Sequence, residues 1–322
     1  MRVKFFDPAK DYLRFRKEYD QAWESVNLRG DLILRKDTEE FEERLANYVG
    51  TKYAVALSSG TDAIYLSLKA LRIKGDVALP SHTFKSTCGA VINAGATPKI
   101  YDMEGIPDSF CSAQILVHIA GEIAEFHDFG IPIIEDACQA FGAIKYPTSK
   151  AQCWSFYPAK ILGGKGDNGA VTTDDPQIYE YIKEARNHFK TDNRDFGGNH
   201  RMDNLHAALL NVKLGHIDDI LSRRKEIAEK YLKELEGTVG LPDNDRFRVW
   251  QDFIVKTDKR NELYEFLEEK GVETMKNEYP FSPAYAKLPL AAKYEAETLR
   301  IPCNENLTDE EVFYVIESIK QF

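Results

Sequence analysis

Short apolar runs alternate with helical patterns in the first part of this sequence. Residues 53–59 (YAVALSS) form such a run, which breaks at Gly60-Thr61-Asp62 before the helical pattern AIYLSLKALRI. Further runs of the same kind are DVALP, TPKIYDM, QILVHI and PIIEDA. Continuous apolar runs of this length are typical of strands buried on both faces of a parallel sheet. The sequence therefore predicts an α/β fold with a mostly parallel central sheet.

The pattern changes toward the C-terminus. A long helical pattern begins at Met202. After Gly240-Leu241-Pro242 a strand pattern (VWQDFIV) and two helical patterns follow, and Thr308 is the expected N-cap of the last helix. We therefore predict a large α/β domain over residues 1–215, which includes an N-terminal helical segment, and a smaller α+β domain over residues 216–322, led by a long helix.

The balance of charge limits the classes of partner. The chain has a formal net charge of -10 and a pI of about 5.3. Such a surface repels nucleic acid and anionic membranes, so we predict neither as a partner. No apolar run approaches the roughly 20 residues that span a bilayer, and the charged N-terminus lacks the apolar core of a signal peptide. The 5 scattered cysteines fit reduced thiols in a cytoplasmic protein.

Residues 153–171 (CWSFYPAKILGGKGDNGAV) contain the pattern G-x-G-x-x-G at Gly164, Gly166 and Gly169. A dinucleotide site of this pattern follows a strand and opens a helix, whose N-terminus faces the pyrophosphate. Here the glycines lead into a strand pattern, GAVTTDD. We therefore predict a tight turn with close backbone approach, rather than a nicotinamide site.

Lys160 lies inside the same stretch and is flanked by apolar residues. The aromatic run WSFY precedes it, and Ile161-Leu162 follow. A lysine is usually a solvated surface residue, but apolar surroundings disfavour the ammonium form and free the amine as a nucleophile. The sequence around Lys160 thus favours a chemical role for its amine.

Two other segments suit a cofactor that carries a pyridine ring and a phosphate. Asp136 ends a buried strand, where its carboxylate would pair with a protonated pyridine nitrogen, the alternative being a structural ion pair or a helix cap. Gly60 and Thr61 lie at a strand-to-helix turn whose N–H groups would hold a phosphate, the alternative being an ordinary N-cap by Thr61 or Asp62. With Lys160 these features form the set that pyridoxal 5′-phosphate (PLP) requires. No metal site is predicted.

The sequence resembles the DegT/DnrJ/EryC1/StrS family of PLP-dependent nucleotide-sugar aminotransferases from about Leu32 to the C-terminus. The resemblance implies the fold of the type I, aspartate aminotransferase-like PLP-dependent transferases. The motifs that carry it stand in the family's order: ILRKDTEEFEERLANYVGTKYAVALSSGTDAIYLSL, LPSHTF, ILVHIAG, IPIIEDACQAFGA, CWSFYPAKILGGKGDNGAV, GGNHRMDNLHAALLNVKL and LRIPCNENLTDEEV.

The resemblance implies a role for each matching residue. Lys160 would hold the cofactor as an internal aldimine and move the proton between C4′ and the substrate carbon. Asp136 would pair with the pyridinium nitrogen and keep it protonated. The remaining cofactor contacts would be Gln139 at the 3-oxygen, Phe84 against the ring face, and Gly60, Thr61 and Ser155 at the phosphate. On the residues alone, Phe84 could equally be a core residue, Gln139 a helix cap and Ser155 a strand-end hydroxyl.

Other residues bear on the partner subunit and the substrate. Asn199 would reach the phosphate of the neighbouring subunit, so the resemblance implies a homodimer with shared active sites, the alternative being a turn residue. Candidate substrate-binding residues are His82, His188, Glu278 and Tyr279. For His82, His118 and His188 a structural or substrate-shaping role is favoured over a catalytic one.

The implied reaction transfers an amino group from L-glutamate to a nucleotide-linked keto sugar (4-keto-6-deoxy or 3-keto), by ping-pong through pyridoxamine phosphate (PMP). Several segments depart from the family's pattern. The chain is short between IYDM and ILVHI and within GAIKYPTSKAQCWSF, Glu278 stands where the family often has histidine, and Phe189 follows His188 where the family tends to have glycine. These departures leave open a smaller acceptor, such as a cyclitol or a modified nucleoside, and a non-catalytic relative. Lys160 argues against the family's dehydrating branch, which has histidine at this position.

Overall fold

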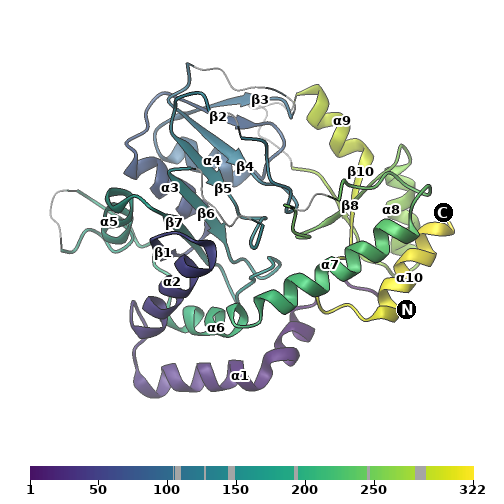
Figure 1. The fold of residues 1–322 in the computed structure, drawn as a ribbon, viewed down its shortest axis with the longest axis horizontal. Helices are drawn as coiled ribbons and strands as arrows, with labels where there is room; N and C mark the ends of the chain where they lie inside the picture. Colours follow the sequence, from purple (N-terminus) through teal and green to yellow (C-terminus); the bar gives the residue numbers. More distant parts are fainter. Residues whose placement is uncertain are drawn as a thin grey trace.

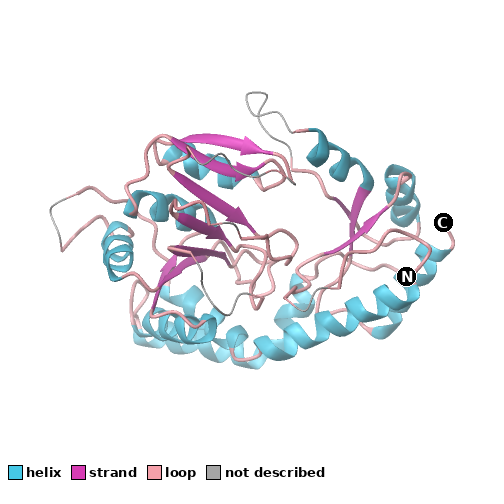
Figure 2. Ribbon diagram, turned by 45° about the horizontal axis from the view of Figure 1, so that its top comes forward, coloured by secondary structure: helices cyan, strands magenta, loops and turns pink. Residues whose placement is uncertain are grey.

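The computed structural model describes residues 1–103, 105, 110–126, 128–143, 149–191, 195–244, 247–279 and 288–322. These residues form a seven-stranded sheet and a separate three-stranded sheet, which Figure 2 shows side by side with helices around each. Several segments in which the sequence departs from the family pattern fall at residues 104, 106–109, 144–148 and 280–287, outside the described residues. The predicted α/β fold is confirmed.

The large sheet has the strand order β1-β7-β6-β5-β4-β2-β3. From β3 across to β6 all neighbours are parallel, whereas β7 is antiparallel to both β6 and β1. β1 therefore points the same way as β6, and the carboxyl ends of all these strands except β7 lie at one edge. The strands are β1 (Tyr53–Leu57), β2 (Asp76–Pro80), β3 (Thr97–Tyr101), β4 (Ala113–Val117), β5 (Ile133–Asp136), β6 (Ala151–Ser155) and β7 (Gly169–Thr173).

Helices cover both faces of the large sheet because side chains alternate along each strand. In β1, Ala54 and Ala56 pack into one hydrophobic cluster, while Val55 and Leu57 pack into the other. Figure 1 shows the helices that supply these clusters. One face is covered by α1 (Pro8–Arg29), α2 (Lys36–Val49) and α6 (Asn204–Leu214), the other by α3 (Gly60–Ala70), α4 (Lys85–Asn93) and α5 (Pro176–Ala185). None of the helices in the described ranges is both long and apolar enough to cross a bilayer.

A small unit is built around the second sheet, whose order is β8-β10-β9 with antiparallel neighbours. Its elements are α7 (Ile217–Glu234), β8 (Phe253–Lys256), α8 (Arg260–Glu269), β9 (Met275–Lys276), α9 (Pro289–Glu297), β10 (Thr298–Ile301) and α10 (Asp309–Lys320). The first turn of α7 packs on the large unit through Ile217 and Ile220, and its later turns enter the small-unit core through Ile227 and Tyr231. Val3, near the N-terminus, also belongs to the small-unit core. The division at residues 215/216 stays a prediction, since these contacts show α7 shared by both cores.

Some elements differ from the sequence-based expectation. The helical pattern from Met202 is interrupted at Gly215 and His216, which separate α6 from α7. β6 did not stand out because Gln152 breaks its apolar run. The Gln152 side chain is buried, donates to Glu135 and accepts from Thr172, so it bridges neighbouring strands. β9, β10 and α9 were likewise not predicted. By contrast, Thr308 caps α10 as expected, in a capping box with Glu311.

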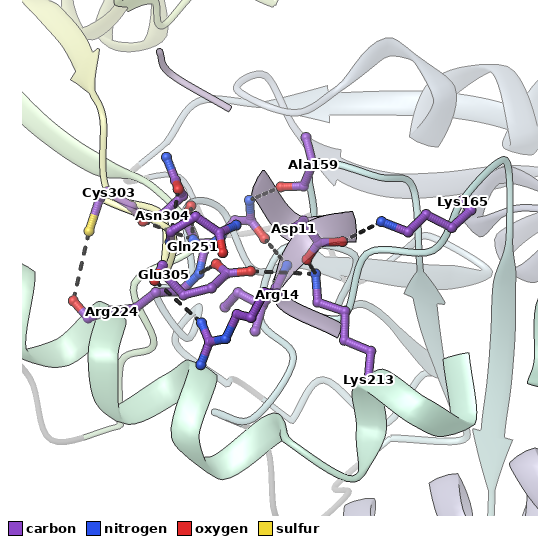
Figure 3. Close-up of polar contacts among 12 residues, drawn as sticks. Asp11, Arg14, Ala159, Lys165, Lys213, Arg224, Gln251, Cys303, Asn304 and Glu305 are labelled. Carbon is purple, nitrogen blue, oxygen red and sulfur yellow. Dashed lines mark hydrogen bonds and ion pairs between the residues drawn. The ribbon is translucent and has the colours of Figure 1, made fainter. Parts of the chain in front are cut away.

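A chain of buried charges, here called the charged network, joins α1, α6, α7 and the segment after β10 (Figure 3). Asp11 accepts hydrogen bonds from Lys165 and from Lys213, the second at 2.9 Å. Glu305 lies 3.4 Å from Lys213 Nζ and 2.8 Å from Arg224 Nε. These five residues hold the two units together with charges that burial would otherwise make unfavourable.

The ionisation of Glu305 should make stability depend on pH. Burial opposes its ionisation, but the nearby Arg224 and Lys213 outweigh burial and lower the pKa of Glu305 from 4.5 to about 2. A carboxyl group whose pKa is lower in the folded than in the unfolded protein stabilises the fold at pH values above its unfolded pKa. For Glu305 this contribution is roughly 3 kcal/mol. This contribution is lost as the pH falls from about 4.5 to about 2. We expect Glu305→Gln to be less stable than wild type at pH 7, with the difference shrinking through that window.

Urea unfolding of both proteins at several pH values between 7 and 3 measures this difference. Glu234→Gln, at an exposed partner of Lys320, is the control and should show no comparable change. A wild-type advantage that stays constant down to pH 3 would contradict the assignment.

Candidate active site

The carboxyl ends of the parallel strands open into a cavity of about 700 Å³. In open α/β sheets, ligands bind outside the carboxyl ends of the strands. The segments that follow β1, β2, β4, β5 and β6 line the cavity from the large unit, and β9, β10 and the residues before β8 line it from the small unit. The walls include the predicted site residues Gly60, Thr61, Phe84, Asp136, Gln139, Ser155, Lys160, Glu278 and Tyr279.

The N-terminus of α3 forms one wall. Gly60 and Thr61 are its first two residues, and their N–H groups precede the first intrahelical bond, from Ala63 N to Ser59 O. The N-cap is Ser59, whose hydroxyl accepts from Asp62 N at 3.0 Å, so an N-cap by Thr61 or Asp62 is wrong. The Ser59 cap leaves the amides of Gly60 and Thr61 suited to hold a phosphate.

Glycine is required at position 60 because the neighbouring chain approaches closely. A Cβ there would lie 2.6 Å from Cys138 Sγ and 3.0 Å from Ser155 Cβ. Gly169, the last glycine of the G-x-G-x-x-G pattern, packs against the same turn. A Cβ added at position 169 would lie 2.5 Å from Gly60 N. This glycine begins β7 rather than a helix, as the sequence predicts. Ser155, opposite Gly169 at the end of β6, lies beside the same helix N-terminus.

The close packing at Gly60 makes a prediction for Gly60→Ala. The added methyl would overlap Cys138 Sγ and displace the α3 amides, so we expect at least about a tenfold loss of PLP affinity, the effect of an ordinary overpacking strain. Titration of the cofactor-free protein with PLP measures it. Gly60→Ala combined with Cys138→Ala, which removes the overlapping sulfur, should recover part of the loss. Unchanged affinity in the single variant would contradict this role of the turn.

Asp136 ends β5 with only 6% of its surface exposed. Its Oδ2 accepts from Thr87 Oγ1 at 2.8 Å, and its Oδ1 accepts from Cys138 N at 3.3 Å. These two bonds fix the orientation of the carboxylate at the cavity wall. A buried, oriented carboxylate is suited to pair with a cationic ring nitrogen.

Lys160 is partly exposed at the cavity rather than enclosed by its apolar sequence neighbours. Phe156, Ile161 and Leu162 pack into the hydrophobic core, so the expectation that they surround the amine is wrong. Burial raises the pKa of the Cys138 thiol; the charge of Asp136 raises it further and that of Lys160 opposes the rise. Amine, carboxylate and thiol therefore occupy one small region.

Gln139 and Tyr279 connect the two sides of the cavity. Gln139 Oε1 accepts from Ala120 N at 2.8 Å, and its Nε2 donates to the Tyr279 hydroxyl at 3.4 Å. Phe84 is 52% exposed, and its ring stands edge-on to that of Tyr279 at 6.2 Å. Phe84 is thus a cavity residue and not part of the core. Glu278, beside Tyr279, pairs with Arg260 at 2.8 Å.

Three predicted residues lie elsewhere. His82 is buried, 2.9 Å from Glu295 Oε1, and lines a neighbouring cavity of about 370 Å³. His188 and Asn199 are exposed on the segment that follows α5, and neither lines the large cavity. His82 packs edge-on against the Tyr279 ring at 4.9 Å, behind the cavity wall. The structure does not bring His188 to the large cavity of this chain.

The backbone at His188 and Phe189 is unusual. Both residues have positive φ, 65° and 52°, a region that favours glycine. The Phe189 side chain is buried, and its ring packs edge-on against Tyr181 at 5.3 Å. Side-chain packing therefore offsets the backbone strain at the position where glycine would be expected.

Sequence reasoning missed several cavity residues. Arg300 in β10 lies 3.4 Å from Asp252 and over the Tyr279 ring at 5.5 Å. His118 accepts from Ala124 N through Nδ1, so its Nε2 carries the proton and donates to Glu135 at 3.0 Å. With both ring nitrogens engaged, His118 has a structural role, as expected. Arg300 and Asp252 gave no sequence signal, because nothing along the chain shows that the small unit faces the strand ends.

The model of the DegT/DnrJ/EryC1/StrS aminotransferase family matches residues 14–320. The chain belongs to this family. The aminotransferase is 34% identical to the dTDP-3-amino-3,4,6-trideoxy-alpha-D-glucose transaminase of Streptomyces venezuelae, over 100% of this chain and 96% of the relative. That alignment spans 370 positions, whereas this chain has 322 residues, so the relative contains residues that this chain lacks.

Two solved structures resemble the aminotransferase throughout. S. venezuelae DesV in complex with a ketimine intermediate has a TM-score of 0.92 at 32% identity and covers 99% of this chain and 98% of its own. The ntda protein of Bacillus subtilis with bound cofactor PMP has a TM-score of 0.87 at 25% identity, with 99% and 85% covered. The predicted family and enzyme class are confirmed, and bound PMP in this relative supports the predicted PLP/PMP cofactor. The amino donor, the acceptor and the homodimer stay predictions.

Proposed function

We propose that this aminotransferase uses PLP to move an amino group from L-glutamate to a nucleotide-linked keto sugar. The observation that carries the proposal is the single cavity in which Lys160, Asp136 and the N-terminus of α3 meet. When bound, PLP supplies an aldehyde that exchanges amino groups and a ring that takes up electrons from the substrate carbon. The residues present fit that group, because the oriented carboxylate of Asp136, the amides at the N-terminus of α3 and the amine of Lys160 all line one cavity.

Each of these residues has a distinct task in the proposal. Asp136 would hold the proton on the ring nitrogen, and the amides of Gly60 and Thr61 with the Ser155 hydroxyl would bind the phosphate. Lys160 Nζ would hold the aldehyde carbon, with loss of water, and the same amine would carry the proton to and from the substrate carbon. Phe84 would lie against the ring face, and Gln139, which contacts Ala120 and Tyr279, would orient the 3-oxygen.

The acceptor belongs to the small-unit side of the cavity. Glu278, Tyr279 and Arg300 lie there, and they offer charged and hydroxyl groups to a polyhydroxylated ligand. The product named for the S. venezuelae relative is a 3-amino sugar, which supports testing 3-keto nucleotide sugars before 4-keto-6-deoxy ones.

The proposal includes a homodimer. Asn199 is exposed and outside the cavity of its own chain, a position from which it would reach the phosphate site of a second copy. Size measurement in solution, together with restored activity on mixing Asn199→Ala and Lys160→Ala subunits, tests the shared site.

A visible absorption spectrum tests the reaction. PLP should give a near-visible band with the protein, and L-glutamate should bleach it while 2-oxoglutarate appears. A panel of 3-keto and 4-keto nucleotide sugars should then restore the band. Without a band the proposed chemistry fails, and a band that glutamate leaves unchanged means another donor. Restoration only by cyclitol or nucleoside ketones would replace the proposed acceptor.

A further inference from the structure

The side-chain amide of Gln251 contacts the peptide groups on both sides of Lys160. Its Oε1 accepts from Ile161 N at 3.1 Å, and its Nε2 donates to Ala159 O, also at 3.1 Å. The Lys160 N–H is itself engaged, donating to Tyr157 O at 2.8 Å. The peptide units that flank the Lys160 Cα are therefore fixed by hydrogen bonds outside any helix or strand.

Gln251 is in turn held by the charged network. It is buried, and its carbonyl accepts from Arg224 at 3.1 Å. Arg224 leads through Glu305 and Lys213 to Asp11, which accepts from Lys165. Lys165 belongs to the same loop as Lys160, so one continuous set of contacts holds this loop on both sides of Lys160 and again at Lys165 (Figure 3).

Such a restraint matters because a lysine side chain has many rotamers. Ordering a flexible side chain costs free energy, and less is lost when its Cα–Cβ direction is already set. Among the described residues, no hydrogen bond or ion pair of the Lys160 amine is present in the structure. The direction of the Lys160 side chain is thus set by the position of its own backbone. Gln251 fixes that backbone through hydrogen bonds to the peptide groups before and after Lys160.

We propose that Gln251 is a positioning residue that aims the Lys160 amine at the cofactor aldehyde. The inference rests on the proposed function, in which Lys160 bonds PLP. Gln251 touches neither of the atoms that react; it acts through the two peptide groups. It also ties this geometry to the small unit, because the next residue, Asp252, lines the cavity and pairs with Arg300.

Comparing the affinities for PLP and PMP distinguishes a misplaced Lys160 amine from a general loss of order in the cofactor site. PMP has an amine in place of the aldehyde and cannot bond to Lys160, whereas PLP can. Gln251→Met keeps the side-chain length and removes both hydrogen bonds. In this variant we expect PLP affinity to fall by about tenfold relative to PMP affinity, as two ordinary hydrogen bonds no longer hold the amine. Gln251→Glu keeps the acceptor for Ile161 N but not the donor to Ala159 O, and should fall between wild type and Gln251→Met.

Asn204→Leu is the matched control. Asn204 is also a buried amide that joins two backbone segments, accepting from Thr38 N and donating to Asp31 O, but it lies outside the cavity lining. Its replacement should lower stability while leaving the PLP to PMP affinity ratio at the wild-type value. An unchanged ratio in both Gln251 variants, or an equal loss of PLP and PMP binding, would overturn the proposal. If wild type itself fails to bond PLP, the proposed function fails instead. If Gln251→Met does not fold, the PLP to PMP affinity ratio of Gln251→Glu alone decides the test.

Discussion

Lys160→Ala should lose the near-visible PLP band and lower the transamination rate by about 10⁴-fold or more, because one amine serves as both nucleophile and general base. PMP should still bind, since in the proposed site the phosphate and ring contacts would come from Gly60, Ser155 and Asp136, which also line the cavity, rather than from the lysine. Absorption spectra, single-turnover rates with L-glutamate and PMP titration measure the three effects.

The control for this variant is Lys150→Ala. Lys150 is exposed just before β6, ten residues before Lys160 in sequence, and does not line the cavity. It should keep the band and the rate of wild type. Wild-type transamination by Lys160→Ala would mean that another group is the base, and the proposed assignment would be withdrawn.

Arg224→Met should destabilise the protein by about 3–5 kcal/mol, the usual effect of removing one partner from a buried ion pair. Arg224 is buried, its Nε donates to Glu305, and its NH1 donates to the carbonyls of Trp250, Gln251 and Cys303. Without Arg224, the Glu305 carboxylate loses its cation at 2.8 Å and keeps the longer contact with Lys213, and three buried carbonyls lose a donor. Urea unfolding followed by tryptophan fluorescence gives the free energy of unfolding.

The neighbouring residue provides a matched comparison. Arg223 also lies on α7 and pairs with Glu226 and Asp309, but those partners are exposed. Arg223→Met should therefore cost less than about 1 kcal/mol. Combining Arg224→Met with Glu305→Leu should recover part of the loss, because the unpaired carboxylate is gone. A loss in Arg224→Met no larger than in Arg223→Met would show that the charged network contributes little.

The part of the site that follows from the large sheet could be predicted from the sequence. Asp136 and Gly60 stand where apolar runs end, and parallel strands bring such ends to one edge. Lys160 and Ser155 were predicted from the residues around them and from the family resemblance. The apolar runs thus gave a reason for Asp136 and Gly60 to meet, and the motif between Cys153 and Val171 added the lysine and the serine.

The contribution of the small unit could not be predicted. Gln251 comes from a predicted strand pattern whose facing direction the sequence does not show, and Arg300 comes from β10, which was not predicted. Their contacts depend on how α7 positions the three-stranded sheet relative to the seven-stranded sheet. Hydrophobic flanking residues likewise did not reveal that Lys160 is partly exposed, since a chain that turns can send Ile161 into the core while the lysine points outward.

The antiparallel direction of β7 has a kinetic consequence. Ser155 pairs with Gly169 across one loop, so β6, the Lys160 loop and β7 form from contacts local in sequence. β1, which pairs Leu57 with Gly169, must close a far longer stretch of chain, and long closures are slow. We expect the docking of β1 to be a late folding step, one that completes the phosphate-binding turn and the sheet together. Ligands that recognise that turn would then bind only the fully folded chain and protect it from partial unfolding at this edge.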